Sequence, residues 1–406
     1  MKRKLDKLVS IIIPVYNSEA TLRRSIDSAL SQTYKNTEII IVDDASYDSS
    51  ADICDEYVIK KYNNLRVVHK EKNEGLLLAR KTGVFTSSGD YILNLDSDDY
   101  IESCMIENLI EDDKKKYSDI ITSGYYLEYA DGSLLHRKDG LKEGYYDLSK
   151  DQKFYNSFIY NGSFLNNGIL PAVWCKLIKR DLLMSIYDGL DLRLNMQEDA
   201  LATYGSIGMA TSVRITEKIY YHYCIDNESM SRRTNENYYI DINNVYKVLK
   251  KVFEKNRYRN CLRKQLDLYM MYWSYAGICE YFGLEEQIVP PYFTFDTDVI
   301  AKGSKVILYG AGRVGKSFYK VCNAKGIELV LWIDRNAEAY KEREYDIDPI
   351  EKIKEVDYDF ILIAMKSDKS AEEIKRQLIL DYEVSKTKII CPEVIFELDK
   401  YVEWNS

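Results

Sequence analysis

The chain has 406 residues, of which 46% are hydrophobic and 30% are charged, and its net charge is −9. This composition is that of a globular protein with two or three domains, and it excludes a disordered or fibrous chain. The negative charge argues against non-specific binding to nucleic acid, so we expect no such partner.

Strand-like and helix-like patterns alternate in the first part of the chain. Apolar strand patterns cover residues 9–14, 38–42, 65–69 and 91–95, and helical patterns lie between them. Such alternation predicts a mostly parallel sheet with helices on both faces, whose ligands bind beyond the carboxyl ends of the strands. Asn17 suits the N-cap of the first helix.

The pattern then changes twice. Tyrosine-rich alternation around Asp131-Gly132 predicts a β-hairpin. Apolar residues at helical spacing predict a helical extension over about 237–282, and Pro290-Pro291 marks a linker. After residue 303 a second strand–helix series begins, with strands at 305–309, 328–333 and 360–364.

The run Asp96-Ser97-Asp98-Asp99 directly follows an apolar strand pattern. Three neighbouring carboxylates repel one another unless a cation binds, and Mg²⁺ and Mn²⁺ prefer a few carboxylates together with phosphate oxygens and water. The run therefore suits a metal-bridged diphosphate. An acidic loop that caps the next helix is the alternative for this run alone.

Other motifs accompany the acidic run in a fixed order. They are Val9–Asn17, Ile41–Ser46, Asn73–Gly75, Ala79-Arg80 with Gly83, Gly89–Tyr91 and Leu95–Asp99. In this order and spacing, residues 8–231 resemble glycosyltransferase family 2, whose members have the GT-A fold. The resemblance implies an inverting, metal-dependent transfer of a sugar from a nucleotide-sugar donor to an acceptor hydroxyl, with UDP as the commonest nucleotide.

The resemblance also implies a donor site. Its residues would be Pro14, Tyr16, Asp43, Arg80, Asp96 and Ser97. The resemblance implies that Asp43 lies close to the base, and the chemistry agrees, since a carboxylate accepts hydrogen bonds from a base N–H and a tyrosine ring can cover the base. Asp96 would lie by the ribose and the metal's water shell, and Asp98 would ligate Mn²⁺ or Mg²⁺. For Arg80, a surface helix arginine is the alternative to a positive neighbour of the donor or Asp96.

Gln197-Glu198-Asp199 resembles the family's Glu-Asp motif. An inverting transfer needs one carboxylate to take the proton of the acceptor hydroxyl, while the metal stabilises charge on the departing diphosphate. We assign the base to Asp199, with Glu198 orienting it or contacting acceptor hydroxyls. An acidic helix N-terminus favoured by the helix dipole is the alternative.

A later segment, Tyr221–Tyr223 followed by Ser229–Ser231, resembles the stretch that closes over the donor phosphates. His222 would ligate the metal or contact a phosphate, and a packed polar side chain is the alternative. Cys224 stands where many family members have arginine, so another cation would have to compensate: Lys218, Arg232 or Arg233.

Trp174 and Lys176 resemble the acceptor-side segment of the family. An aromatic ring there can stack on a sugar face. A tryptophan packed in the core is the rival interpretation.

The motif Gly310-x-Gly312-x-x-Gly315 follows a strand, opens a helix and precedes Asp334. This context matches the dinucleotide fingerprint, in which backbone N–H groups face a pyrophosphate. We expect an accessory nucleotide-binding or assembly unit, and a relic that binds nothing is the alternative. Rival functions for the whole chain are an NAD-dependent oxidoreductase acting through this unit and a non-catalytic sugar-nucleotide-binding scaffold.

These patterns predict an α/β protein with a GT-A doubly wound mixed sheet, a helical extension and a small C-terminal Rossmann-like α/β domain. The domains would cover residues 1–235, 236–300 and 301–406. Scattered cysteines predict reduced thiols in the cytoplasm, and the apolar runs are too short to span a membrane.

The family's acceptors are saccharides, lipid-linked glycans and surface polymers. We therefore expect a cytoplasmic protein, with peripheral association at the inner membrane face and homo-oligomer formation both open.

Overall fold

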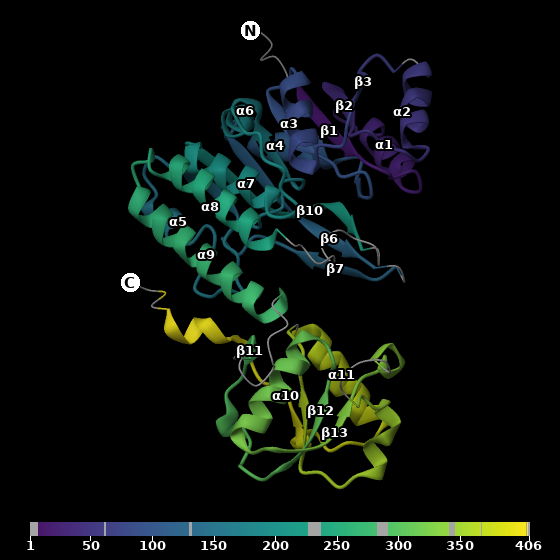
Figure 1. Ribbon diagram of the computed structural model, residues 1–406, viewed down its shortest axis with the longest axis vertical. Coiled ribbons are helices and arrows are strands. Elements are labelled where there is room, and N and C mark those ends of the chain that lie inside the picture. Colours follow the sequence, from purple (N-terminus) through teal and green to yellow (C-terminus); the bar gives the residue numbers. More distant parts are fainter. Residues whose placement is uncertain are drawn as a thin grey trace. The chain divides into compact units, whose positions relative to one another are not determined.

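The structure is a computed structural model that describes residues 7–60, 62–129, 132–225, 237–281, 291–340, 346–366, 368–402 and 404. The chain forms two compact units. The first unit comprises Met1–Gly162 and Asn166–Ser274, and the second comprises Ser163–Leu165 and Tyr275–Ser406. Figure 1 shows the elements of both units, coloured along the sequence.

A ten-stranded mixed sheet forms the centre of the first unit, in the order β3-β2-β1-β4-β9-β6-β10-β5 with β7 paired to β6 and β8 to β10. The strands are β1 Val9–Val15, β2 Thr37–Asp43, β3 Leu65–His69, β4 Tyr91–Asn94, β5 Tyr100–Ile101, β6 Ile120–Glu128, β7 Leu134–Arg137, β8 Gly144–Asp147, β9 Lys176–Lys179 and β10 Ser212–Cys224. The first four strands of the order pair in parallel, whereas β9 is antiparallel to both of its neighbours. The predicted hairpin is confirmed, because β6 and β7 pair in an antiparallel register.

The parallel strands bring the polar motifs to one edge of the sheet. Every residue of β1 is buried, and α1 and α3 both pack against this strand. Near-continuous apolar runs such as Ile11–Ile13 suit strands covered in this way. Because β1, β2 and β4 run in the same direction, the residues after Val15, Asp43 and Asn94 emerge at a common edge.

Helices flank the sheet (Figure 1). Their bounds are α1 Leu22–Leu30, α2 Ser50–Ile59, α3 Leu76–Thr86, α4 Met105–Asp113, α5 Gln152–Tyr155, α6 Arg180–Tyr187, α7 Glu198–Met209, α8 Tyr238–Phe253 and α9 Arg259–Tyr281. The predicted helical spacing is confirmed in α8 and α9, where Ile242, Leu249, Leu262 and Leu266 are buried. Among the described helices, none is both long enough and apolar enough to cross a bilayer.

The alternative interpretation of Asn17 as the N-cap of the first helix is wrong. Helix α1 begins at Leu22 with Thr21 as its N-cap, and Asn17 instead adopts a left-handed conformation with φ 50°. Its side-chain oxygen accepts the backbone N–H of Tyr47 at 3.0 Å. Asn17 therefore contacts the next strand–helix loop instead of capping the helix. Asparagine can adopt this conformation because it tolerates positive φ.

A four-stranded parallel sheet forms the centre of the second unit, in the order β13-β12-β14-β15. Its elements are β12 Lys305–Tyr309, α10 Arg313–Lys325, β13 Glu328–Ile333, β14 Phe360–Ile363, α11 Asp368–Asp381 and β15 Ile389–Ile390, with a separate pair β11 Phe293–Thr294 and β16 Ile395–Phe396. Short 3₁₀ helices connect them: η2 Thr297–Val299, η3 Ala337–Tyr340, η4 Ile350–Glu355, η5 Lys386–Lys388 and η6 Glu397–Tyr401. The strands that the sequence predicts are present, and kinship with nucleotide-binding Rossmann domains stays a prediction.

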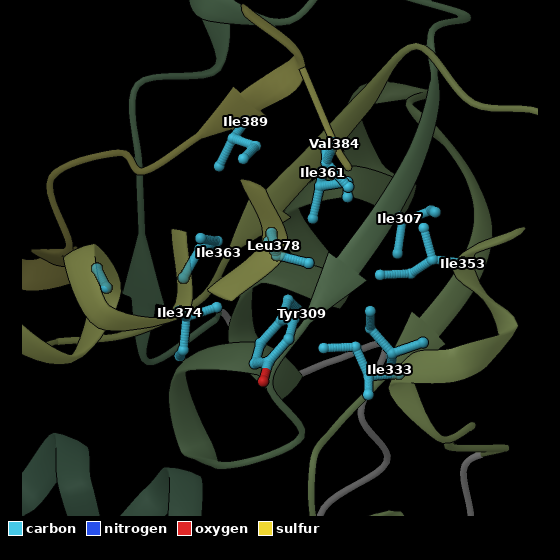
Figure 2. Packing of buried hydrophobic residues seen from close by; sticks show 12 residues of the cluster. Ile307, Tyr309, Ile333, Ile353, Ile361, Ile363, Ile374, Leu378, Val384 and Ile389 are labelled. Atoms are coloured by element: carbon cyan, nitrogen blue, oxygen red, sulfur yellow. The ribbon is translucent and has the colours of Figure 1, made fainter. Parts of the chain in front are cut away.

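One buried cluster fills the space on one face of this small sheet. Figure 2 shows Ile307 and Tyr309 from β12 together with Ile361 and Ile363 from β14, and Leu378 of α11 completes the contact. These strand residues alternate along the chain, so they share a face of the sheet. The apolar pattern of the strands thus places the core between the sheet and α11.

Gly315 allows α10 to approach the end of β12. A Cβ atom added at Gly315 would lie 1.9 Å from the carbonyl oxygen of Gly310, whereas one added at Gly312 would meet nothing within 4 Å. The carbonyl oxygen of Gly310 also accepts the indole N–H of Trp332 at 2.8 Å. The spacing of the glycine motif therefore has a packing cause that needs no ligand.

Replacing Gly315 by alanine is expected to destabilise the second unit by about 1–3 kcal/mol, because α10 must move away from Gly310. Gly312→Ala is the matched control and should cost no more than about 1 kcal/mol, the usual size of a change to alanine at a helix N-cap. Urea unfolding of both variants measures the difference. Equal stabilities would contradict the packing explanation.

Candidate active site

Arg80 of α3 lies at the centre of a cluster of charged side chains, at the edge of the main sheet where β1, β2 and β4 end. Its side chain is 1% exposed, and its Nη2 donates to the two carboxylate oxygens of Asp96 at 2.8 and 3.1 Å. Its Nη1 donates to Glu198 at 3.4 Å and makes a short hydrogen bond to Asp199. One buried guanidinium therefore joins the acidic run after β4 to the start of α7.

Burial alone would lower the pKa of Arg80, but the charges of Asp199, Asp96 and Glu198 outweigh it and raise the pKa well above the usual value. The guanidinium therefore stays charged. The alternative of a surface helix arginine is excluded by this burial. Arg80 is a structural counter-ion for three carboxylates that come from two distant parts of the chain.

Glu198 and Asp199 open α7 side by side. Burial, and then the neighbouring Asp199, raise the pKa of Glu198 to about 7. Burial also raises the pKa of Asp199, although Arg80 opposes it. The preceding residue, Gln197, has φ 67° and accepts a short hydrogen bond from the hydroxyl of Tyr269 in α9. A partly accessible pair of carboxyl groups with raised pKa values suits proton transfer near neutral pH.

Asp99, the last member of the acidic run, fixes the backbone rather than facing solvent. It is fully buried, and its carboxylate accepts the Tyr221 hydroxyl at 2.7 Å and the backbone N–H of Cys224 at 2.8 Å. The Tyr221 hydroxyl also accepts the backbone N–H of Asp96 at 3.2 Å. Strand β10 is thereby tied to the loop after β4.

Asp98 has a different environment. It is exposed, and within the described part of the chain no other residue donates a hydrogen bond to its carboxylate. The surrounding protein still displaces much of the bulk water, and this, together with the Asp96 charge, raises the pKa of Asp98 to about 6. Repulsion between two neighbouring carboxylates is what a bound cation would relieve.

The side chains around Asp98 suit a hard divalent cation that takes most of its ligands from water and phosphate rather than from the protein. The described residues contain no group of three or more acidic, histidine or cysteine side chains placed to hold a metal. Mg²⁺ is commonly bound by one or two carboxylates plus phosphate oxygens and water. Asp98, with Asp96 nearby in the same loop, could therefore hold such a cation together with a diphosphate.

The predicted nucleotide-pocket residues lie after β1 and β2. Pro14 is buried within β1, whereas Tyr16 is 45% exposed and meets Tyr47 edge-to-face with ring centroids 6.0 Å apart. Asp43 is buried and accepts the backbone N–H of Ser46 at 3.0 Å. An exposed aromatic pair next to a buried carboxylate can cover a planar base and accept its N–H.

Ser97 connects this region with the acidic run. Its hydroxyl lies 2.7 Å from that of Ser18, and its carbonyl oxygen accepts the Thr21 hydroxyl at 2.9 Å. The loops after β1 and β4 are therefore linked directly by hydrogen bonds.

His222 is held by two glutamates. Its Nδ1 lies 2.9 Å from Glu128 and its Nε2 lies 3.7 Å from Glu102, while its ring stacks on Tyr100 with centroids 4.2 Å apart. Both ring nitrogens therefore lie beside glutamate carboxylates. A role as metal ligand stays a prediction, and the two glutamates give no sequence signal. The predicted segment Ser229–Ser231, like Arg232 and Arg233, lies outside the described residues.

Trp174 belongs to an aromatic cluster. It is 6% exposed and stacks on Tyr221 with ring centroids 4.3 Å apart, with Tyr125 edge-on at 4.6 Å. Lys176 is fully buried, and its ammonium donates to the carbonyl oxygen of Ala172 at 2.7 Å. Burial favours the interpretation of Trp174 as a core residue behind the site.

The accessory glycine motif lies in the second unit, and its residues form hydrogen bonds with one another. The Asp334 carboxylate accepts the backbone N–H of Ala311 at 2.8 Å and that of Asn336 at 2.8 Å. Gly310 has φ 104°, a conformation that glycine adopts readily. Asp334 thus holds the glycine loop, and nucleotide binding by Gly310, Gly312, Gly315 and Asp334 stays a prediction.

Sequence reasoning missed several residues of the main site. Tyr187 of α6 is fully buried, and within the described residues its hydroxyl has no hydrogen-bond partner. Tyr47 and His69 lie beside the predicted nucleotide pocket. None of them belongs to a recognised motif, although the position of His69 at the carboxyl end of a strand is a signal that could have been used.

Both units are similar to known proteins. Residues 10–183 match a family model described as Glycosyl transferase family 2, and residues 302–390 match one described as C2185-like, N-terminal. Glycosyltransferase GlyG of Streptococcus pneumoniae serotype 4 is 33% identical over 45% of this chain and 60% of its own length. The poly(ribitol-phosphate) β-N-acetylglucosaminyltransferase TarP of Staphylococcus aureus is 31% identical over 60% of this chain and 73% of its own length.

A solved structure supports the same fold. The crystal structure of S. aureus TarS 1-349 in complex with UDP-GlcNAc aligns with a TM-score of 0.51 at 20% identity, over 69% of this chain and 77% of that one. The mixed α/β fold with its large mixed sheet therefore matches GT-A glycosyltransferase structures, as the sequence predicts. This chain covers only 32–60% of the lengths of GlyG and two further curated relatives.

Proposed function

Because this chain belongs to glycosyltransferase family 2, we propose that it transfers a sugar from a nucleotide-sugar to an acceptor hydroxyl with inversion at the anomeric carbon. The observation that carries this proposal is the contact of one buried guanidinium, that of Arg80, with both Asp96 and Asp199. It holds the donor-side acidic run and the candidate base in one cluster. The two substrates would meet there.

Each residue then has a role. Tyr16 would cover the base and Asp43 would accept a base N–H, with Pro14 and Ser97 shaping the donor site. Asp199 would accept the proton of the acceptor hydroxyl as its oxygen forms the new bond to the anomeric carbon. Glu198 would share that ionisation or orient the acceptor, since its carboxylate lies beside Asp199.

A divalent cation, Mn²⁺ or Mg²⁺, would be held by Asp98, with Asp96 nearby and His222 a further predicted ligand. When bound, it would neutralise charge that develops on the departing nucleoside diphosphate. The exposed carboxylate of Asp98 and the raised pKa caused by its surroundings favour this assignment.

The donor is proposed to be a UDP-sugar carrying a hexose or an N-acetylhexosamine, and the acceptor a saccharide, lipid-linked glycan or polymer of surface polysaccharide. TarP, whose name describes transfer of N-acetylglucosamine to poly(ribitol-phosphate), supports such an acceptor class. Action would take place in the cytoplasm or at the inner membrane face.

The rest of the chain would support this reaction. We propose that residues 1–235 are the catalytic domain, 236–300 a helical extension with a linker, and 301–406 an accessory domain. An NAD-dependent oxidoreductase centred on the accessory domain leaves the cluster around Arg80 unexplained. A non-catalytic sugar-nucleotide-binding scaffold would need no carboxyl pair with raised pKa values at the acceptor side.

A screen of nucleotide-sugars with candidate acceptors tests the proposal. We expect release of UDP that requires Mn²⁺ or Mg²⁺. In calorimetry, UDP should bind at least about tenfold more tightly with Mn²⁺ than with EDTA, and Asp98→Ala should remove this gain. Asp181→Ala, at an exposed position of α6, is the matched control. An unchanged gain in Asp98→Ala would refute the metal assignment.

The rate of transfer is expected to rise with pH through a value near 7. Burial and the neighbouring Asp199 raise the pKa of Glu198 to about 7, and burial also raises the pKa of Asp199. The ionised form accepts the proton, so activity is lost as the pH falls below this value. The ionisation belongs to the pair rather than to one residue. Profiles of kcat at saturating donor from pH 5.5 to 8.5 measure it, because they do not include donor binding, and a kcat that falls with pH would oppose the assignment.

A further inference from the structure

His69 ends β3 beside the proposed nucleoside pocket, and both of its ring nitrogens face carboxylates. Its Nδ1 lies 2.9 Å from Oδ2 of Asp43, which comes from β2, and its Nε2 lies 3.2 Å from Oδ1 of Asp55, which comes from α2. The Asp43 side chain is 4% exposed, whereas those of His69 and Asp55 are 40% and 63% exposed. The histidine therefore connects a buried carboxylate with a solvated one.

This geometry selects the protonated ring. A neutral imidazole carries one N–H and can satisfy one carboxylate, whereas the imidazolium can donate to both. The hydrogen bond to Asp43 accordingly raises the pKa of His69, partial burial opposes the rise, and Asp55 adds to it. Lys70, the next residue, pairs with Asp44 at 2.8 Å and Glu74 at 2.7 Å. Asp43 and Asp55 are thus the charged groups facing the ring.

Asp43 is fixed from both sides. Its Oδ1 accepts the backbone N–H of Ser46, and its Oδ2 accepts the Nδ1–H of the His69 imidazolium. The loop that carries Ser46 is itself bound to the loop after β1, since the Ser46 hydroxyl accepts the N–H of Asn17 at 3.1 Å. Each carboxylate oxygen keeps a further lone pair for a ligand.

We propose that His69 is a positioning residue of the nucleoside pocket, which as an imidazolium holds the Asp43 carboxylate toward a base that carries an N–H donor. The inference rests on the proposed function and adds a residue to its donor site. A uracil or guanine edge offers such an N–H, whereas a cytosine ring nitrogen at that edge is an acceptor and would face a carboxylate. The site would therefore disfavour cytidine nucleotides.

Binding of UDP, GDP and CDP to the full chain, measured by calorimetry with Mn²⁺ present, tests the inference. His69→Ala should weaken binding of UDP or GDP about tenfold, the cost of a lost hydrogen bond to a charged group. His69→Gln keeps one amide N–H for Asp43 and should recover part of the loss. His136→Ala is the matched control, because His136 is exposed on β7. Thermal unfolding of each variant checks that it folds.

The pH profile separates positioning from packing. The affinity of the wild-type chain for UDP should fall as the pH rises through the raised pKa of His69. The same series with His69→Gln records the effect of UDP's own titration, and the fall in the wild type should exceed it. Asp55→Asn should move this midpoint to lower pH without weakening binding at pH 5.5, because it removes one of the two charges that favour the imidazolium.

The outcomes separate the two proposals. If UDP, GDP and CDP all fail to bind the wild-type chain, the proposed function fails and the inference falls with it. If UDP binds and His69→Ala matches His136→Ala in affinity, or if the Asp55→Asn profile equals that of the wild type, the inference is overturned while the proposed function stands. Equal affinity for CDP and UDP would likewise overturn it.

Discussion

Asp199→Asn is expected to lower the turnover number by about 10²- to 10⁴-fold, the range typical for loss of a general base. The change keeps the shape of the side chain but removes the group that would accept the acceptor proton. The amide can still accept a hydrogen bond from Arg80, whose short contact with Asp199 holds the start of α7. Initial rates of UDP release with the acceptor found by screening measure the loss.

Three measurements show that the loss is chemical. Asp188→Asn, at an exposed position directly after α6, changes the same functional group away from the cluster and should leave the rate unchanged. Thermal unfolding should show that Asp199→Asn is folded, and its UDP affinity should change far less than its turnover number. A variant that keeps more than about a tenth of the wild-type rate would rule out Asp199 as the base.

Replacing Arg80 by methionine is expected to lower the free energy of unfolding by about 3–5 kcal/mol, as removal of one partner of a buried ion pair does. Methionine fills much of the arginine volume, so the main effect is electrostatic. The variant would leave the carboxylates of Asp96, Glu198 and Asp199 without their shared cation. Urea unfolding at constant pH measures the change.

A surface pair gives the matched control. Arg23 and Glu56 form a bidentate pair at 2.7 and 2.9 Å, but both side chains are about half exposed, at 47% and 48%. Arg23→Met should therefore cost no more than about 1 kcal/mol. If the two arginine variants lose the same stability, Arg80 is not the buried counter-ion described above.

The deficit of Arg80→Met should shrink as the pH falls. Burial raises the pKa values of Glu198 and Asp199 against the opposing charge of Arg80, so without the guanidinium these two groups bind more protons in the folded chain than in the unfolded chain. Stability then rises, relative to the wild type, as these groups become protonated. Repeating the unfolding at pH 5 and pH 8 tests the sign.

The sheet and most candidate site residues could be predicted from the sequence, because apolar strand patterns end at polar motifs. Asp43 and Asp96 are examples, whereas Asp199 opens helix α7 and is assigned from its resemblance to the family's motif. The partners of these residues could not be predicted. Arg80 contacts Asp199 across 119 positions, and His69 contacts Asp43 across 26. Such pairings depend on the strand order and on helix packing, which single motifs do not contain.

Two further cases show how packing decides between local alternatives. Asn17 has a residue type suited to capping, but a backbone N–H 30 positions later takes its oxygen. Trp174 fits both a sugar platform and a core residue, and the ring of Tyr221 stacked on it favours the core. Residue type restricts the options, and neighbours that are distant in the chain select among them.

One shared cation makes the two halves of the site dependent on each other. Any ligand that changes the charge around Asp96 alters how strongly Arg80 attracts Asp199, since both carboxylates compete for the same guanidinium. Thermodynamic reciprocity then requires that an occupant of either half changes the affinity of the other half by the same factor. Donor and acceptor would therefore bind as a cooperative pair, and steady-state kinetics with both substrates varied would show an interaction between their Michaelis constants.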